Sequence, residues 1–195
     1  MEMTTEFFER GFLPERYVEG LRNYRSLVKG LMIAVQDVTV APLSEHYPLT
    51  ATIATEDWCG DSACVVPIIT RFCAVNEIPL RIFRGSETRG LKEFYEGSGT
   101  NHIPVLSFWS ADGSEAVRWV EAPEAVQDQK RAWKAERPEF MELYNRRADG
   151  DEEAARAFGK LYRQFLDEMA LWYQEGLWDA VLAELAEALR STNAS

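Results

Sequence analysis

The chain has little cysteine and almost no histidine. Its 195 residues include three cysteines, an odd number that makes no disulfide framework, and two histidines. His46, beside Tyr47-Pro48, and His102 form no zinc-ligand pattern. The sequence also lacks a phosphate-binding loop and a glycine-rich dinucleotide turn. We therefore expect no metal site and no resident cofactor.

Long apolar runs and excess positive charge are also missing. No run of apolar residues approaches the length needed to span a bilayer, and the first ten residues are acidic and aromatic rather than a basic-then-apolar leader. The 21 Lys and Arg against 32 Asp and Glu give a net charge of −11, which repels phosphate groups. We expect a cytoplasmic protein that binds neither nucleic acid nor an anionic membrane.

What the chain does contain is an alternating strand and helix pattern between two helical segments. We expect an N-terminal helical extension at 1–45, a core at 46–136 and a C-terminal helical extension, packed on that core, at 137–195. The first extension has apolar residues at helical spacing from Tyr17 to Val35, which predicts one helix with Pro14 in its first turn. The last is predicted helical from Pro138 to Leu189, with breaks at 149–151 and Gly176. Its wide apolar face is more typical of a core than of a dimer contact, so both a monomer and a homodimer stay open.

The core segment predicts an α/β fold. Its expected strands are 49–56, 79–84, 104–109 and 115–121, and its expected helices are 60–76 and 87–97. Strand–helix–strand units of this size give parallel strands with right-handed crossovers, here followed by an antiparallel hairpin.

The most informative segment is Trp58-Cys59-Gly60-Asp61-Ser62, where a strand is expected to end and a helix to begin. A cysteine there lies beside the unpaired N–H groups and the positive dipole end of the helix. That environment favours the nucleophilic thiolate over the thiol. We expect Cys59 to be presented to solvent at this position as a redox-type cysteine.

This segment resembles the active site of the thioredoxin superfamily, in which Trp-Cys-Gly-Pro-Cys opens the first helix after a central strand. Pro67 resembles the proline that kinks that helix, Ile103-Pro104 the cis-proline facing the cysteine, and Asp112-Gly113 the last hairpin turn. The Cys-Gly-Asp-Ser form is similar to a bacterial group of thioredoxin-like proteins of poorly defined function. The resemblance covers about residues 30 to 135. It implies a thioredoxin-like fold, a central mixed sheet flanked by helices.

Two departures from the family pattern limit what carries over. Ser62 stands at the position of the resolving cysteine, and Ile53 at that of a buried acid, so dithiol reductase activity is not implied. Cys64 lies five positions beyond Cys59, roughly 8.7 Å between Cα atoms on an ideal helix, whereas a disulfide needs about 7 Å or less. We favour Cys64 and Cys73 as buried structural thiols. Unwinding the first helical turn would still let Cys64 resolve a disulfide.

The residues next to Cys59 have expected roles. Gly60 lets a bound disulfide approach the backbone, and Ser62 donates a hydrogen bond to the sulfur. Asp61 should raise the pKa of Cys59, although an acid in a first helical turn is also an ordinary stabilising choice. Trp58 either shields the sulfur or only packs.

A second set of candidates lies farther along the chain. By resemblance, a cis Ile103–Pro104 bond would hold the Ile103 backbone opposite Cys59, where it can pair with an extended substrate. His102 is either a proton shuttle or, as we favour, a surface histidine. Arg84 either offsets Asp61, or binds a carboxylate of a small thiol, or is an exposed strand-end arginine.

The expected function is thiol–disulfide oxidoreduction through a single cysteine. Its partners would be protein disulfides or low-molecular-weight thiols, with an external thiol as reductant and no bound cofactor. The alternative is a redox-inactive thioredoxin-like module that binds a client peptide in the groove at Ile103-Pro104.

Overall fold

The computed structural model describes residues 1–44 and 48–192, so His46 lies outside the described residues. The chain forms two compact units. One comprises Met1–Glu121 with Val181–Ser195, and the other comprises Ala122–Ala180. These limits differ from the boundaries at 45/46 and 136/137 expected from the sequence, and the two units are described separately below.

The first unit contains a four-stranded mixed sheet with the strand order β2-β1-β3-β4. The strands are β1 (Thr50–Thr55), β2 (Leu80–Arg84), β3 (Val105–Trp109) and β4 (Glu115–Val120). β1 runs parallel to β2 and antiparallel to β3, and β3 pairs with β4 in the expected hairpin. The α/β prediction is confirmed. The hairpin turn needs Gly113, whose φ is 82°, a conformation that side chains rarely adopt.

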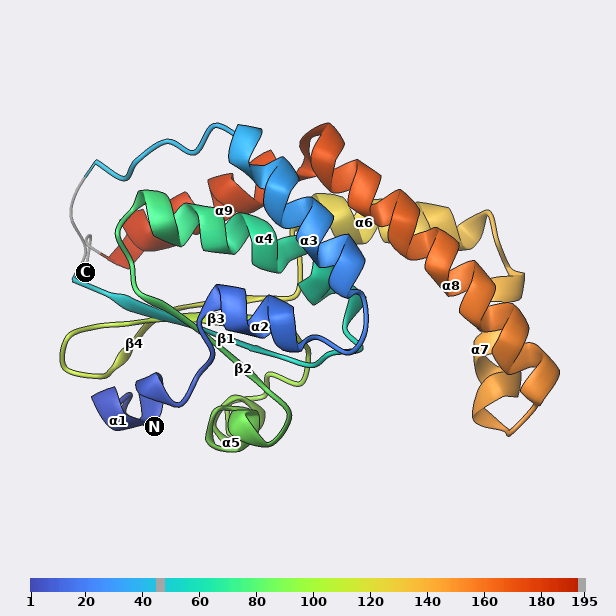
Figure 1. Cartoon of the computed structure of the whole chain (residues 1–195), viewed down its shortest axis with the longest axis horizontal. Coiled ribbons are helices and arrows are strands. Elements are labelled where there is room, and N and C mark those ends of the chain that lie inside the picture. The colour runs from blue at the N-terminus through green and yellow to red at the C-terminus, as the bar shows by residue number, and fades with distance from the viewer. Residues whose placement is uncertain (45–47, 193–195) are drawn as a thin grey trace. The chain divides into compact units, whose positions relative to one another are not determined.

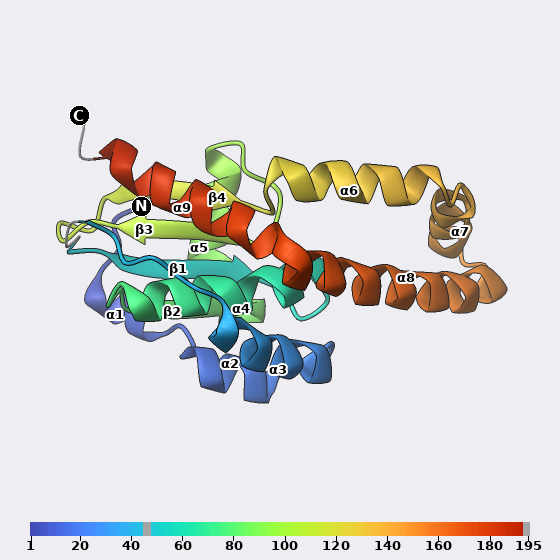
Figure 2. The same ribbon diagram turned by 90° about the horizontal axis from the view of Figure 1, so that it is seen from above.

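Helices cover both faces of this sheet (Figures 1 and 2). α4 (Gly60–Val75) and residues 181–192 of α9 (Trp178–Thr192) lie on one face. On or near the other face of the sheet lie α1 (Thr5–Glu9), the 3-10 turn η2 (Gly85–Thr88) and α5 (Arg89–Gly97). On the α5 side, the core is built from the fully buried side chains Phe83, Leu91 and Trp109. The predicted helix 60–76 is almost entirely buried because it lies between the sheet and α3 (Arg25–Ala34).

The single helix predicted from Tyr17 to Val35 was wrong. The structure has two helices here, α2 (Pro14–Gly20) and α3, and α3 is followed by the 3-10 turn η1 (Val35–Asp37). Tyr24, with φ 56°, is left-handed and breaks the continuity that the apolar spacing suggested. Pro14 does occupy the first turn of α2. The preceding Phe12 forms an antiparallel bridge with Ile82, so this segment lies along the outer edge of β2.

The second unit is helical. It contains α6 (Glu124–Ala135), α7 (Glu139–Ala148), α8 (Glu152–Trp172) and the π-helical turn η3 (Tyr173–Leu177). Aromatic rings pack its interior, at centroid distances of 4.8 to 5.7 Å among Trp133, Phe140, Phe158 and Phe165. Both predicted breaks are present: Asp151 caps α8 after Gly150, and Gly176 has a φ of 140°.

Among the described helices, none combines the length and the apolar character needed to cross a bilayer.

Candidate functional site

Cys59 lies where β1 gives way to α4, as predicted, and its sulfur caps the helix. The residue has an extended backbone conformation (φ −79°, ψ 112°), and its Sγ accepts a hydrogen bond from the Ser62 N–H at 3.5 Å. This contact satisfies one of the backbone donors that a helix start leaves unpaired. Gly60 and Asp61 follow in the first turn, and Ser62 is fully buried.

The Ile103–Pro104 peptide is cis and faces the cysteine. The Cys59 thiol donates a hydrogen bond to the Ile103 carbonyl oxygen at 3.5 Å. On the far side, the Pro104 carbonyl accepts a bond of 2.8 Å from the Glu121 N–H, which ties this loop to the end of β4. The structure thus brings Cys59, Ser62 and Ile103 together from segments far apart in the sequence.

The expectation that Cys59 is presented to solvent was wrong. Cys59 is only 7% exposed. This burial raises the pKa of the thiol above its ordinary value, and the Asp61 charge raises it further, while hydrogen bonds from the Ser62 side chain and backbone lower it. Burial is the largest of these effects, because removing water penalises the charged form. The contacts that lower the pKa of Cys59 are hydrogen bonds from the Ser62 side chain and from the N–H groups of Ser62 and Asp61.

Two residues behind the cysteine were missed in the sequence. The Thr55 hydroxyl donates to the Ser62 hydroxyl at 2.5 Å, and the Tyr17 hydroxyl is hydrogen-bonded to Thr55. Both are 1% exposed. A hydroxyl at the last position of a strand before a cysteine was the only available signal for Thr55, and nothing local in the sequence connects Tyr17 to it.

Arg84 and His102 are engaged elsewhere. Arg84 Nη1 binds both carboxylate oxygens of Asp57, at 2.6 and 2.7 Å, and is half-buried rather than an exposed strand end or a partner of Asp61. This partner, Asp57, lies two positions before Cys59 and was not among the predicted site residues. His102 is 74% exposed and its Nδ1 lies 3.6 Å from Glu121 Oε2, which agrees with the surface histidine that we favoured.

The remaining cysteines are buried and form no disulfide. Cys64 is 0% exposed and Cys73 is 1% exposed, and no disulfide joins either of them to Cys59. Burial raises the pKa of Cys73 to about 12. Both residues therefore fit the structural role that we favoured over a resolving one.

A cavity of about 460 Å³ is lined by Trp58, which precedes Cys59, and by Ile103, while Cys59 itself is not part of its lining. Its walls come from the end of β1, from α5 and from the loop before Pro104, and they include Trp58 and Ile103. Trp58 is 62% exposed, so it forms part of the rim rather than part of the core. Glu56, Lys92, Glu96 and His102 supply the charged groups of the lining.

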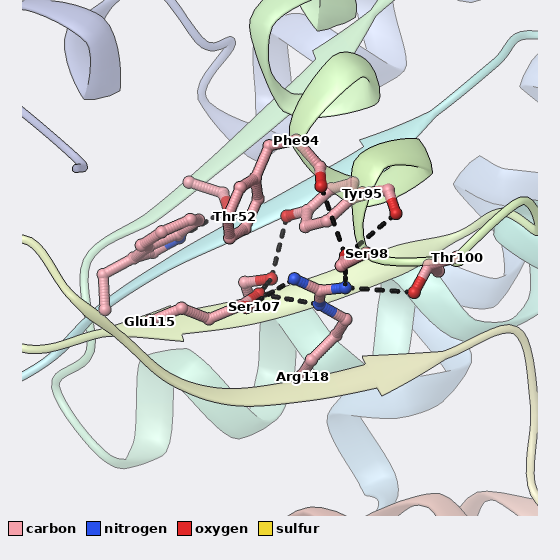
Figure 3. A network of polar contacts seen from close by, with 9 residues as sticks. Thr52, Phe94, Tyr95, Ser98, Thr100, Ser107, Glu115 and Arg118 are labelled. Carbon is pink, nitrogen blue, oxygen red and sulfur yellow. Dashed lines mark hydrogen bonds and ion pairs between the residues drawn. The ribbon is translucent and has the colours of Figure 1, made fainter. Parts of the chain in front are cut away.

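An ionic network holds the loop that leads to Pro104 (Figure 3). Arg118 reaches from β4 to the hydroxyls of Ser98 at 2.5 Å and Thr100 at 3.0 Å. Its other nitrogens bind the Glu115 carboxylate at 2.6 and 2.9 Å. Ser107 donates to that carboxylate at 2.5 Å and bonds the Tyr95 hydroxyl at 2.8 Å. The network fixes the loop against the sheet by charge-assisted bonds.

Within residues 1–44 and 48–192, no three side chains of the metal-binding types gather in one place.

Comparison with known proteins agrees with this geometry. No curated protein matches the sequence. Among solved structures, a protein of unknown function from Pseudomonas aeruginosa is similar over 98% of this chain and 99% of its own, with a TM-score of 0.62 and 14% identity. An HIV epitope-scaffold is similar over 95% of this chain and 96% of its own, with a TM-score of 0.60 and 16% identity. At these identities the likeness shows the fold alone.

The sequence match is more specific. Residues 16–134 match the model of a family described as Thioredoxin, and this range spans more than half of the chain. It includes most of α2, the strand-to-helix junction with Cys59, the cis-proline loop and the closing hairpin. The chain therefore belongs to the thioredoxin-like superfamily.

Proposed function

We propose that the protein is a thiol–disulfide oxidoreductase that works through Cys59 alone. The observation that carries this proposal is the position of the Cys59 sulfur, which caps α4 and lies 3.5 Å from the Ile103 carbonyl across the cis peptide. Ser62 stands where a dithiol enzyme has its second cysteine, and Cys64 and Cys73 are buried away from solvent. Resolution must therefore come from an external thiol.

The chemistry balances without a cofactor. The Cys59 thiolate attacks a mixed disulfide between a client protein and a low-molecular-weight thiol, forming a Cys59 disulfide with the small thiol as the client sulfur leaves as a thiolate. That thiolate takes the proton that Cys59 gave up to solvent. A second small thiol, deprotonated, then attacks the small thiol's sulfur. Cys59 leaves as a thiolate, and the two small thiols are released as their disulfide.

The surroundings of Cys59 offer places for such a substrate. Trp58 is exposed beside the sulfur, Gly60 presents backbone without a side chain, and the Ile103 backbone can pair with an extended client segment. The cavity along α5 is large enough to take the small thiol's remaining atoms. Three cysteines that form no disulfide fit a reducing compartment such as the cytoplasm.

A turnover assay tests this function. A carrier protein capped with a fluorescent glutathione mixed disulfide is incubated with the enzyme and excess reduced glutathione, and release of the fluorophore is followed. We expect catalysed release by the unmodified protein and by Cys64→Ser and Cys73→Ser, and release at the uncatalysed rate with Cys59→Ser. Full activity of Cys59→Ser would overturn the proposal.

A second candidate is a redox-inactive module that binds an extended peptide. It is favoured by the burial of Cys59, which raises the pKa of the thiol, and by the exposed Trp58 beside the cis-proline loop. In that case, affinity for client peptides would fall on Trp58→Ala and would be indifferent to Cys59→Ser. No variant would show catalysed release in the turnover assay.

A further inference from the structure

A line of buried hydroxyl groups runs from the N-terminal helices to the cysteine. Tyr17 on α2 is hydrogen-bonded to Thr55 at the end of β1, and Thr55 donates to Ser62 on α4 at 2.5 Å. The Ser62 side chain is in turn hydrogen-bonded to Cys59. The three hydroxyl residues are at most 1% exposed. Three separate elements therefore meet through their hydroxyl groups behind one sulfur.

The direction of the bond between Thr55 and Ser62 decides what remains for the sulfur. Each hydroxyl has one hydrogen to donate. Burial raises the pKa of the Tyr17 phenol well above its ordinary value, so this end of the line stays neutral. The Thr55 hydroxyl can also donate to the Glu56 carbonyl oxygen, but that distance is 3.4 Å, whereas the distance to the Ser62 hydroxyl oxygen is 2.5 Å. With Thr55 donating to Ser62, the Ser62 hydrogen is left for the sulfur.

We propose that Tyr17 and Thr55 are positioning residues that act through Ser62 to stabilise the Cys59 thiolate. The thiol form donates its own hydrogen to the Ile103 carbonyl at 3.5 Å and needs no donor. The thiolate needs donors in place of the water that burial has removed, and a chain of aligned hydroxyls strengthens its last bond. Since Tyr17 is buried, the line has no exit to solvent at that end, and it supplies hydrogen bonds rather than a proton path.

The charged groups around the line do not supply this stabilisation. Asp61, on the cysteine's own helix, raises the pKa of Cys59. Asp57 and Arg84, which act on Tyr17, form a close ion pair with each other. Beyond the cis peptide, His102 lies beside Glu121. The donors to the thiolate are therefore neutral groups: the Ser62 hydroxyl at the end of the line and the N–H groups of Ser62 and Asp61.

The structure provides a matched control on the same strand. Thr52 is also on β1, is 0% exposed and uses its hydroxyl to accept a 2.8 Å bond from Trp109 Nε1. It takes no part in the line to Cys59. Thr52→Val and Thr55→Val remove the same atom from the same strand, so their difference isolates the effect of the hydroxyl line.

The test is the pH dependence of Cys59 alkylation by iodoacetamide, followed on the Cys59 peptide by mass spectrometry. Below its pKa, the rate of alkylation is proportional to the thiolate fraction. At a pH of about 7.5, which lies below the ordinary pKa of a cysteine thiol, we expect Thr55→Val to react about tenfold more slowly than the unmodified protein. We expect Tyr17→Phe to be about threefold slower, because it removes a bond one step farther away. Thr55→Ser should restore the rate, and Thr52→Val should leave it unchanged.

Equal rates for Thr55→Val and the unmodified protein would overturn the proposal, as would an equal slowing by Thr52→Val. If Thr55→Val does not fold, Tyr17→Phe decides, since it removes one oxygen and no carbon. The inference rests on Cys59 as the nucleophile of the proposed function, but alkylation needs no disulfide substrate. Loss of the fluorophore turnover with a normal alkylation profile would count against the function and not against the hydroxyl line.

Discussion

Two polar systems in the same unit, one buried and one partly buried, differ in charge. The line from Tyr17 through Thr55 to Ser62 consists of neutral hydroxyls and ends at a titrating sulfur. The network around Arg118 is built on an ion pair with Glu115 and ends at the hydroxyls of a loop (Figure 3).

This difference indicates what each system does. The ion pair between Arg118 and Glu115 is present whether or not the cysteine ionises, so its effect is on the folded state. A neutral hydroxyl line changes little in energy until a thiolate forms at its end, so its effect lies in reactivity. The predictions that follow separate stability from reactivity, beginning with the largest effect.

Arg118→Met should destabilise the fold by about 3 kcal/mol, because it leaves the Glu115 carboxylate without its partner in a largely buried site. Urea unfolding measures the loss. Lys92→Met is the matched control, since Lys92 pairs with Glu96 at 3.8 Å on the exposed face of α5 and should cost about 0.5 kcal/mol or less. Similar losses for the two variants would mean that the network is no more than a surface ion pair.

Tyr95→Phe and Tyr17→Phe should separate the two systems at the level of one oxygen atom. Each should cost about 1 kcal/mol of stability near neutral pH through a lost hydrogen bond. Only Tyr17→Phe should slow the alkylation of Cys59. A slowing by Tyr95→Phe of the same size would show that the sulfur senses both systems.

Tyr95 also predicts a dependence of stability on pH. Burial raises the pKa of Tyr95 to about 12, above the value of an unfolded tyrosine. Its contribution is fully present below the unfolded pKa, near 10, and is lost as the pH rises through the folded value. The free energy of unfolding should therefore fall on the alkaline side, and the fall should be shallower in Tyr95→Phe. An unchanged slope in that variant would contradict this account.

Asp61→Asn should have the smallest effect. The Asp61 charge raises the pKa of Cys59, so its removal should speed alkylation near neutral pH by about threefold, as expected for a partly exposed charge. Glu139→Gln, an acid in the first turn of α7, is a control for general loss of negative charge. Slower alkylation of Asp61→Asn would show that the carboxylate supports the thiolate.

Local patterns in the sequence were enough to predict the sheet and the position of Cys59. The Thr-, Ile- and Ala-rich run before Trp58 and the apolar helix after it define the junction without any long-range contact. The break at Tyr24 was missed because a left-handed residue leaves the apolar spacing unchanged.

The parts of the site that could not be predicted depend on tertiary contacts. Tyr17 lies far from Thr55 in the sequence, and only the packing of α2 brings their hydroxyls together. Arg84 was placed at the right end of its strand, but its partner Asp57 could be identified only from the geometry. The burial of Cys59, which raises the pKa of its thiol, could not be predicted because no local pattern reports it.

The most direct test of the central claim is the mass of the protein after incubation with oxidised glutathione, with the modified peptide identified. We predict one glutathione adduct on Cys59 that added thiol removes completely. No adduct at that residue, or an adduct found on Cys64 and retained in Cys59→Ser, would contradict the assignment of Cys59 as the nucleophile.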